Sequence, residues 1–302
     1  MAVPPEEINI RLIEVFSIGC GARAQGYGPL ARQITDDLAY CLSGFDDLIA
    51  RPHHLLGLPI EDLDPNLGEG FDPALDPDGE LPDRIAFILF SSLPSDALVR
   101  QLTRERGAGM ALSGRMVFEG AQVDLSMNLW DVGPPNLLWC RALFGALDQL
   151  PTMLIEAVGH LAYSLQAHGA QTLDAARTRV AQRVGTHSFS ALRHYAAASD
   201  MMRRTRLDIR QTPNPQTLLL SLCSALNADP DYMAPQLMCL EYSLERLKAK
   251  DIAYAQALLE RLSKLREPRL LFDLLRFEAH LCLDQTDSDA RQLQRARSRR
   301  VL

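Results

Sequence analysis

The sequence predicts an α+β domain with a mixed sheet, followed by an all-α domain of helical repeats. Three observations support this fold class. Short apolar and β-branched runs, typical of strands, occur only before Gly169. After Gly169, apolar residues recur at helical spacing, and glycine, proline or aspartate separates the short segments. We therefore place the first domain at residues 1–168, the helical domain at 169–285 and a basic, disordered tail at 286–302.

The composition is that of a globular, cytoplasmic protein. Of the 302 residues, 47% are hydrophobic and 23% charged, so the chain is long enough to bury a core without disulfides. The net charge of −7 gives no bulk attraction to nucleic acid. The N-terminus lacks the pattern of a signal peptide, and no apolar stretch approaches the roughly 20 residues that cross a membrane. The six scattered cysteines predict reduced, buried thiols.

The first elements are a strand, a glycine-rich loop and a helix. The apolar run Ile8–Ile18 has strand character. Pro29 suits the first turn of a helix. One apolar residue then recurs every four positions, which predicts a buried helix face: Leu30, Ile34, Leu38 and Leu42. A short strand is expected at Leu48–Ala50, and residues 57–83, rich in acid, proline and glycine, predict a long surface loop.

The rest of the first domain alternates strands and helices. In order, we expect a strand at Ile85–Phe90, a helix from Asp96 through Arg106, strands at 109–120 and 121–132, a strand at 137–145 and a helix at Asp148–Gln166. The two central strands form an antiparallel hairpin with one buried face. Apolar residues alternate with Asp124, Ser126, Asn128 and Trp130 along the second of them.

The second domain is predicted to be helical throughout. Its helices are expected at Leu173–Val184, Ser188–Arg206, Pro215–Asn227, Tyr232–Lys248, Ala253–Leu265 and Arg269–Leu283. Short antiparallel helices joined by short breaks are typical of a helical-repeat array.

The most specific pattern in the chain lies in Gly109–Leu165. It combines a strand with a glycine and a basic residue, a hairpin, a strand ending in Asp, a turn, a Leu-Trp strand and a helix. The residues that carry it are Leu112, Gly114, Arg115, Gly120, Val123, Leu129, Asp131, Leu138, Trp139 and Phe144–Leu150. This pattern resembles the TolB amino-terminal-like domain of bacterial proteins, which often precedes tetratricopeptide repeats. Relative to that domain, the acidic loop is an insertion.

The downstream helices resemble diverged tetratricopeptide units. Pro230 and Pro268 resemble the prolines that end such units, although they stand 38 residues apart where about 34 is typical. The usual aromatic and glycine positions of the repeat are mostly absent. The resemblance implies an accessory, sensing or scaffolding part rather than a catalyst.

The glycine-rich loop formally matches a dinucleotide pattern. Gly19, Gly21 and Ala24 satisfy G-x-G-x-x-G/A. Such a site needs its helix to open at the second glycine, where the helix N-terminus meets the pyrophosphate. Pro29 places the helix start later, and the chain has no GK[ST]. We therefore predict a connecting loop and no cofactor, with a nucleotide-binding enzyme kept as the second alternative.

No catalytic or metal-ligating residues are predicted. The pairs His160 with His168 and His187 with His194 lack the three or four convergent ligands that zinc requires. The glycine-flanked Ser113 lies in a predicted strand, so no nucleophile can be assigned there.

Two groups of residues are candidates for contact with a partner. The segment Arg177–Arg210 holds eight arginines and two acids, and its densest part carries Arg203, Arg204, Arg206 and Arg210. A basic face of this kind binds an acidic protein, the chain's own acidic loop or a phosphate backbone. Trp130 and Trp139 flank a Gly-Pro-Pro turn, where they form an exposed aromatic surface or, as we favour, pack in the core.

The predicted function is non-catalytic protein–protein interaction. The chain would act as an adaptor or as a structural or regulatory subunit of a bacterial cytoplasmic assembly, with protein partners that include a second copy of itself. The first alternative is a nucleic-acid-associated regulator that uses the basic helices at 177–210.

Overall fold

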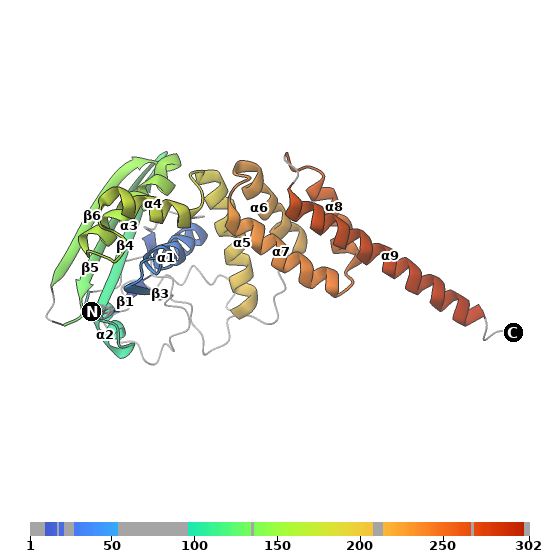
Figure 1. The fold of residues 1–302 in the computed structure, drawn as a ribbon, viewed down its shortest axis with the longest axis horizontal. Helices are drawn as coiled ribbons and strands as arrows, with labels where there is room; N and C mark the ends of the chain where they lie inside the picture. Colours follow the sequence, from blue (N-terminus) through green and yellow to red (C-terminus); the bar gives the residue numbers. More distant parts are fainter. Residues whose placement is uncertain are drawn as a thin grey trace, which may run out of the picture. The chain divides into compact units, whose positions relative to one another are not determined.

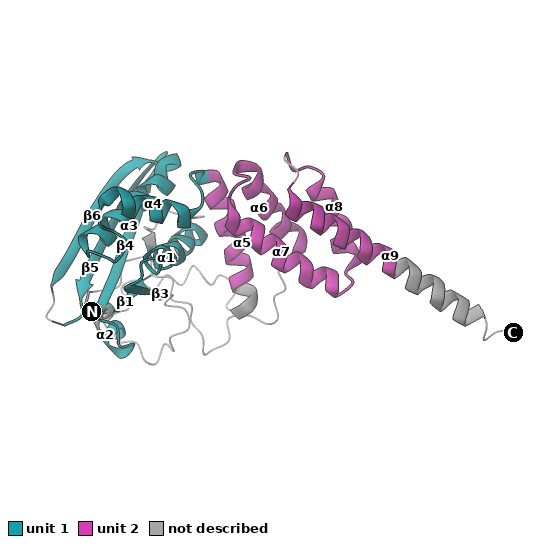
Figure 2. Cartoon of the chain, viewed as in Figure 1, with its two compact units in different colours: residues 1–189 teal, residues 190–302 magenta. Residues whose placement is uncertain are grey.

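The computed structural model describes residues 10–16, 18–20, 27–53, 96–133, 136–207, 214–266 and 269–298 (Figure 1). The acidic loop at 57–83 and the predicted strand at Ile85–Phe90 lie outside these ranges. The chain divides into two compact units, residues 1–189 and 190–302 (Figure 2). The first is an α+β unit and the second is helical in the part described, as the sequence predicts.

The first unit is built on a mixed sheet. Its strands are β1 (Arg11–Phe16), β2 (Gly19–Cys20), β3 (Leu48–His53), β4 (Met110–Glu119), β5 (Gln122–Asp131) and β6 (Leu137–Ala146), in the order β3-β1-β4-β5-β6 with β2 beside β4. Strand β1 is parallel to β3 and β4, whereas β4, β5 and β6 are antiparallel. Gly120 adopts a positive φ of 62° in the β4–β5 turn, a conformation that glycine allows at little cost. The predicted hairpin is therefore confirmed.

Three helices lie on one side of this sheet (Figure 1). They are α1 (Gly28–Leu42), α3 (Leu150–Ser164), which follows a short 3-10 turn, and α4 (Leu173–Val184). Helices α1 and α3 pack against the face of the sheet, and α4 packs against both of them. Between these helices and the sheet lies a core of fully buried side chains: Val15, Ile34, Leu38, Leu112, Leu129, Leu154 and Leu161. Helix α2 (Asp96–Glu105) packs at one end of the other face, where Val99 and Leu102 meet Phe16 and Ala111. Successive side chains of each strand point to opposite faces of the sheet, so both faces carry apolar residues that a helix can cover.

The second unit is a set of helices around a single apolar core. They are α5 (Phe189–Leu207), α6 (Pro215–Ala228), α7 (Met233–Lys248), α8 (Ile252–Leu262) and α9 (Leu270–Ser298). Leu222, Cys239, Leu258 and Leu275 are among the side chains that meet at the centre. Asn214 caps α6 and Asp251 caps α8 through backbone N–H groups of the first turn, which explains where these helices begin.

Two boundaries differ from those predicted. Helix α4 groups with the sheet, so the first unit ends at Phe189 rather than at residue 168. Arg183 of α4 donates a hydrogen bond to the Tyr40 carbonyl of α1 at 2.8 Å, an attachment that no local pattern reveals. Helix α9 runs on to Ser298, into the segment 286–302 for which the sequence predicts a disordered tail. No glycine or proline interrupts that stretch, so the backbone can remain helical.

Candidate interaction surfaces

The predicted arginine cluster lies at the end of α5. Arg203 is half-buried in this helix. Arg204 and Arg206 share the helix, but only their backbone is described, and Arg210 lies outside the described residues. The structure therefore places three of the four on one helix, and their role in partner recognition stays a prediction.

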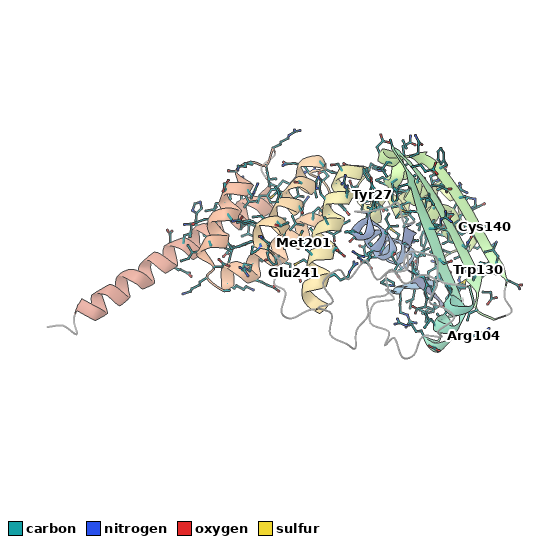
Figure 3. The ribbon with its side chains drawn as sticks, turned by 180° about the vertical axis from the view of Figure 1, so that it is seen from behind. Tyr27, Arg104, Trp130, Cys140, Met201 and Glu241 are labelled. Atoms are coloured by element: carbon teal, nitrogen blue, oxygen red, sulfur yellow. The ribbon has the colours of Figure 1, made fainter. Side chains whose placement is uncertain are left out.

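The two tryptophans lie on opposite faces of the sheet. Trp139 on β6 is directly across from Leu129 on β5, so its ring points toward the helices and is only 8% exposed. Trp130, the neighbour of Leu129, points to the other face. It is half-buried against the apolar residues around α2, among them Val99 and Leu102, near Arg104 (Figure 3). The two rings therefore form no shared aromatic surface. Trp139 pairs with Leu129, and neighbouring residues of a strand point to opposite faces, so Trp130 and Trp139 must lie on different sides of the sheet.

Trp139 has a hydrogen-bond partner that no sequence pattern links to it. Its indole Nε1 donates to Nδ1 of His160 on α3 at 3.2 Å, and Oγ of Ser164 lies 3.2 Å from the same nitrogen. Burial, with the nearby charges of Arg141 and Arg177, holds the pKa of His160 below its ordinary value of 6.5. The imidazole therefore stays neutral at neutral pH, with Nδ1 free to accept.

We expect acidification to break this contact. Because the folded pKa of His160 is depressed, its contribution to stability is complete above pH 6.5 and is lost as the pH falls through the folded pKa. In a Trp130→Phe background, the fluorescence of Trp139 should change as the pH is lowered from 6.5 through the folded pKa of His160. His160→Gln keeps an acceptor that does not titrate, so its emission should be flat over that range. An equally flat response in the parent would contradict the assignment.

A buried glutamate lies in the middle of the sheet. Glu14 on β1 is fully buried, and its carboxylate contacts Nη2 of Arg51 at 2.6 Å and Nη1 of Arg106 at 3.8 Å. Arg51 stands beside Glu14 in the parallel β1–β3 register and also donates to the Arg106 carbonyl at 3.0 Å. The arginines offset the charge of Glu14, so this cluster serves the fold. In the sequence, the one sign of this ion-pair cluster is that an acidic residue, Glu14, lies within the apolar run Ile8–Ile18.

The acids before β3 are also engaged within the chain. Asp47 accepts a hydrogen bond from the backbone N–H of His168 at 2.7 Å and forms an ion pair with Arg11. Asp46 contacts His168 Nδ1 and Arg179, each at 3.0 Å. These bonds, His168 first, hold the pKa of Asp46 below its usual range. Both acids thus fix the α3–α4 connection against the end of α1.

The remaining sequence candidates give no convergent chemistry. Helix α1 begins at Gly28, one residue before Pro29, while residues 21–26 of the glycine loop lie outside the described part. Within the described ranges, no three His, Cys, Asp or Glu side chains gather as metal ligands, and no helix is long and apolar enough to span a membrane. Cys41, Cys223, Cys239 and Cys282 are buried thiols, as predicted. Cys140 is exposed, which corrects that prediction for one cysteine, because its side chain leaves the sheet on the face away from the helices.

Two apolar surfaces are exposed instead. On α9, Leu270 is 88%, Leu274 46% and Phe277 59% exposed. These residues are spaced at i, i+4 and i+7, so they share one side of the helix. On β6, every second side chain from Cys140 to Phe144 is exposed on the sheet face away from α3. Both elements are predicted from the sequence but their exposed faces are not, because strand and helix periodicity do not tell which face meets a neighbour.

Comparisons with known proteins give little further constraint. No protein-family model matches the chain, and a search of curated proteins finds no match. Two solved structures are similar in part, the PelC dodecamer from Paraburkholderia phytofirmans and a single-substitution variant of it. Each is 12% identical with a TM-score of 0.25, and the alignments cover 60% of this chain and 89–90% of theirs. At this TM-score the likeness supports no conclusion.

Proposed function

We propose that this chain is a non-catalytic protein–protein interaction module of a bacterial cytoplasmic assembly, and that its helical unit binds an amphipathic helix of a protein partner. The α+β unit would be a TolB amino-terminal-like domain, and the helical unit a diverged tetratricopeptide-like array. The single observation that carries the proposal is the exposed stripe of α9, defined as Leu270, Leu274 and Phe277.

The stripe is unusual because the opposite side of α9 is already buried. Phe272, Leu275 and Ala279 are at most 2% exposed and pack into the core of the unit. A surface helix needs only one apolar face to join its own core. A second face of large apolar residues has no role in the fold of the described helices and fits a helix packed alongside, the way helices add to such arrays.

The test is to charge the stripe. Leu274→Lys should cut capture of protein partners from the native host at least tenfold, since it buries an ammonium in the contact. Gln256→Lys, exposed on α8 and away from the stripe, should leave capture unchanged. Both variants should keep the circular dichroism and melting temperature of the parent, because neither position is buried.

Three outcomes are informative. Equal loss with both lysines would show that net charge, not the stripe, governs capture. Unchanged capture with Leu274→Lys would move the search to the arginines of α5. Capture of nucleic acid that weakens steeply with salt would favour the nucleic-acid alternative.

A further inference from the structure

Strand β6 is an edge of the sheet within the described residues, and from Trp139 to Ala146 it has few of the features that usually protect an edge, although its register with β5 shifts at Leu138. The opposite edge strand, β3, is six residues long and contains Pro52, which cannot donate to a further strand. Strand β6 is ten residues long and contains no proline and no lysine. Its one charged residue, Arg141, is half-buried on the side of the helices. A long, apolar edge of this kind is a template for another strand.

The direction of the free backbone groups on β6 follows from one hydrogen bond. Leu147 N–H donates to the Ala121 carbonyl at 2.8 Å, and these two residues continue the β5–β6 register. In an antiparallel ladder, every second residue faces the neighbouring strand with both backbone groups. Counting back from Leu147, the residues that face β5 are Trp139, Arg141, Leu143 and Gly145. The register with β5 is unbroken from Trp139 to Ala146 and shifts at Leu138, so the N–H and C=O groups of Cys140, Ala142 and Phe144 point away from the sheet.

The same three residues carry exposed side chains. Phe144 is 72% exposed, and Cys140 and Ala142 are exposed as well. Figure 3 shows Cys140 on this outermost strand. One added strand would satisfy the free backbone groups and cover these side chains together. An apolar patch alone, or a free edge alone, would not specify a strand as the partner.

We propose that β6 pairs antiparallel with β6 of a second copy of this chain, about a two-fold axis at Ala142. The partner strand must show alternating apolar side chains on one face, and β6 itself has that pattern. About this axis, Cys140 lies opposite Phe144 of the partner subunit, so a small side chain meets a large one in both halves of the interface. Such a contact is isologous, as expected for a two-fold dimer.

Charge selects this axis over the one at Arg141. With the axis at Ala142, Arg141 lies opposite Leu143 of the partner subunit. A shift of the axis to Arg141 would place two arginines directly across from one another, which is destabilising. The paired strands would form on the order of ten backbone hydrogen bonds and join two mixed sheets into one.

The oligomeric state tests the proposal. Sedimentation equilibrium of the full chain should show a dimer. Ala142→Pro removes an outward N–H without touching the β5–β6 ladder, and Ala142→Lys places a charge in the contact; both should give monomers with unchanged circular dichroism. Ala121→Lys makes the same change at an exposed turn position and should remain dimeric. A monomeric parent, or dimers that both Ala142 variants leave intact, would overturn the proposal.

Two further measurements identify the strand that pairs with β6 and the position of the two-fold axis. Phe144→Cys should cross-link to Cys140 of the partner subunit under diamide, since paired Cα atoms about 5.5 Å apart suit a disulfide, while the parent should not cross-link. A cross-link through Cys140 alone in the parent would overturn the Ala142 axis. A monomeric parent whose Cys140, Ala142 and Phe144 amides exchange slowly would show another segment of the same chain on this edge, not a second copy.

Discussion

Replacing Arg51 with alanine should lower the free energy of unfolding by about 3 kcal/mol. The reason is the position of Glu14, which is fully buried on β1 and forms an ion pair with Arg51 at 2.6 Å. The change removes this ion pair, and Arg106, which contacts Glu14 at the longer distance of 3.8 Å, also loses the bond that Arg51 donates to its carbonyl. A buried carboxylate deprived of its partner costs far more than the pair itself contributes.

Chemical denaturation with a double-mutant cycle measures this effect. Glu14→Gln combined with Arg51→Ala should recover much of the loss, because the glutamine leaves no buried charge. Asp174→Ala is the control: it removes an exposed partner of Arg177 in the same unit and should cost less than about 1 kcal/mol. If Arg51→Ala is as mild as Asp174→Ala, then Arg106 or groups beyond the described residues hold Glu14.

The helices were predictable because their ends are encoded locally. Thr172 accepts a hydrogen bond from the Ala175 N–H, and Gly185 adopts a left-handed φ of 71°, so α4 spans Leu173–Val184 as predicted. Asn214 before Pro215 likewise opens α6 at the predicted residue. The hairpin of β4 and β5 follows from alternation and the turn at Gly120.

The contacts between distant segments were not predictable. Arg51 meets Glu14 only because β3 lies beside β1 in the sheet order, and the predicted strand at Leu48–Ala50 stopped short of Arg51. Helix α4 joins the first unit through contacts with α1 and α3, which its own sequence does not announce. The exposed faces of α9 and β6 depend in the same way on which side of each element has neighbours.

A second large effect is expected at Asp37 on α1. Its Oδ1 accepts a hydrogen bond from Gln33 at 2.8 Å, while its Oδ2 is closed to solvent and has no hydrogen-bond partner among the residues described. Burial raises the pKa of this carboxyl to about 7. The hydrogen bond from Gln33 lowers the pKa in part, and the charge of Asp36 raises it a little further. Between pH 4 and 7 the native state therefore binds a proton that the unfolded state has released. The contribution to stability is complete at low pH and is lost as the pH rises through about 7.

We expect Asp37→Asn to abolish this pH dependence. Asparagine offers one acceptor and an N–H donor, much like the protonated carboxyl, so the variant should gain stability relative to the parent as the pH rises from 5 to 8. The gain should be roughly 3 kcal/mol, since a raised pKa of this size corresponds to about 1.4 kcal/mol for each pH unit, less an allowance for partial solvent access. Urea denaturation at both pH values decides the matter. If the difference between variant and parent is the same at pH 5 and pH 8, Asp37 is ionised throughout and its buried oxygen has a cationic partner outside the described residues.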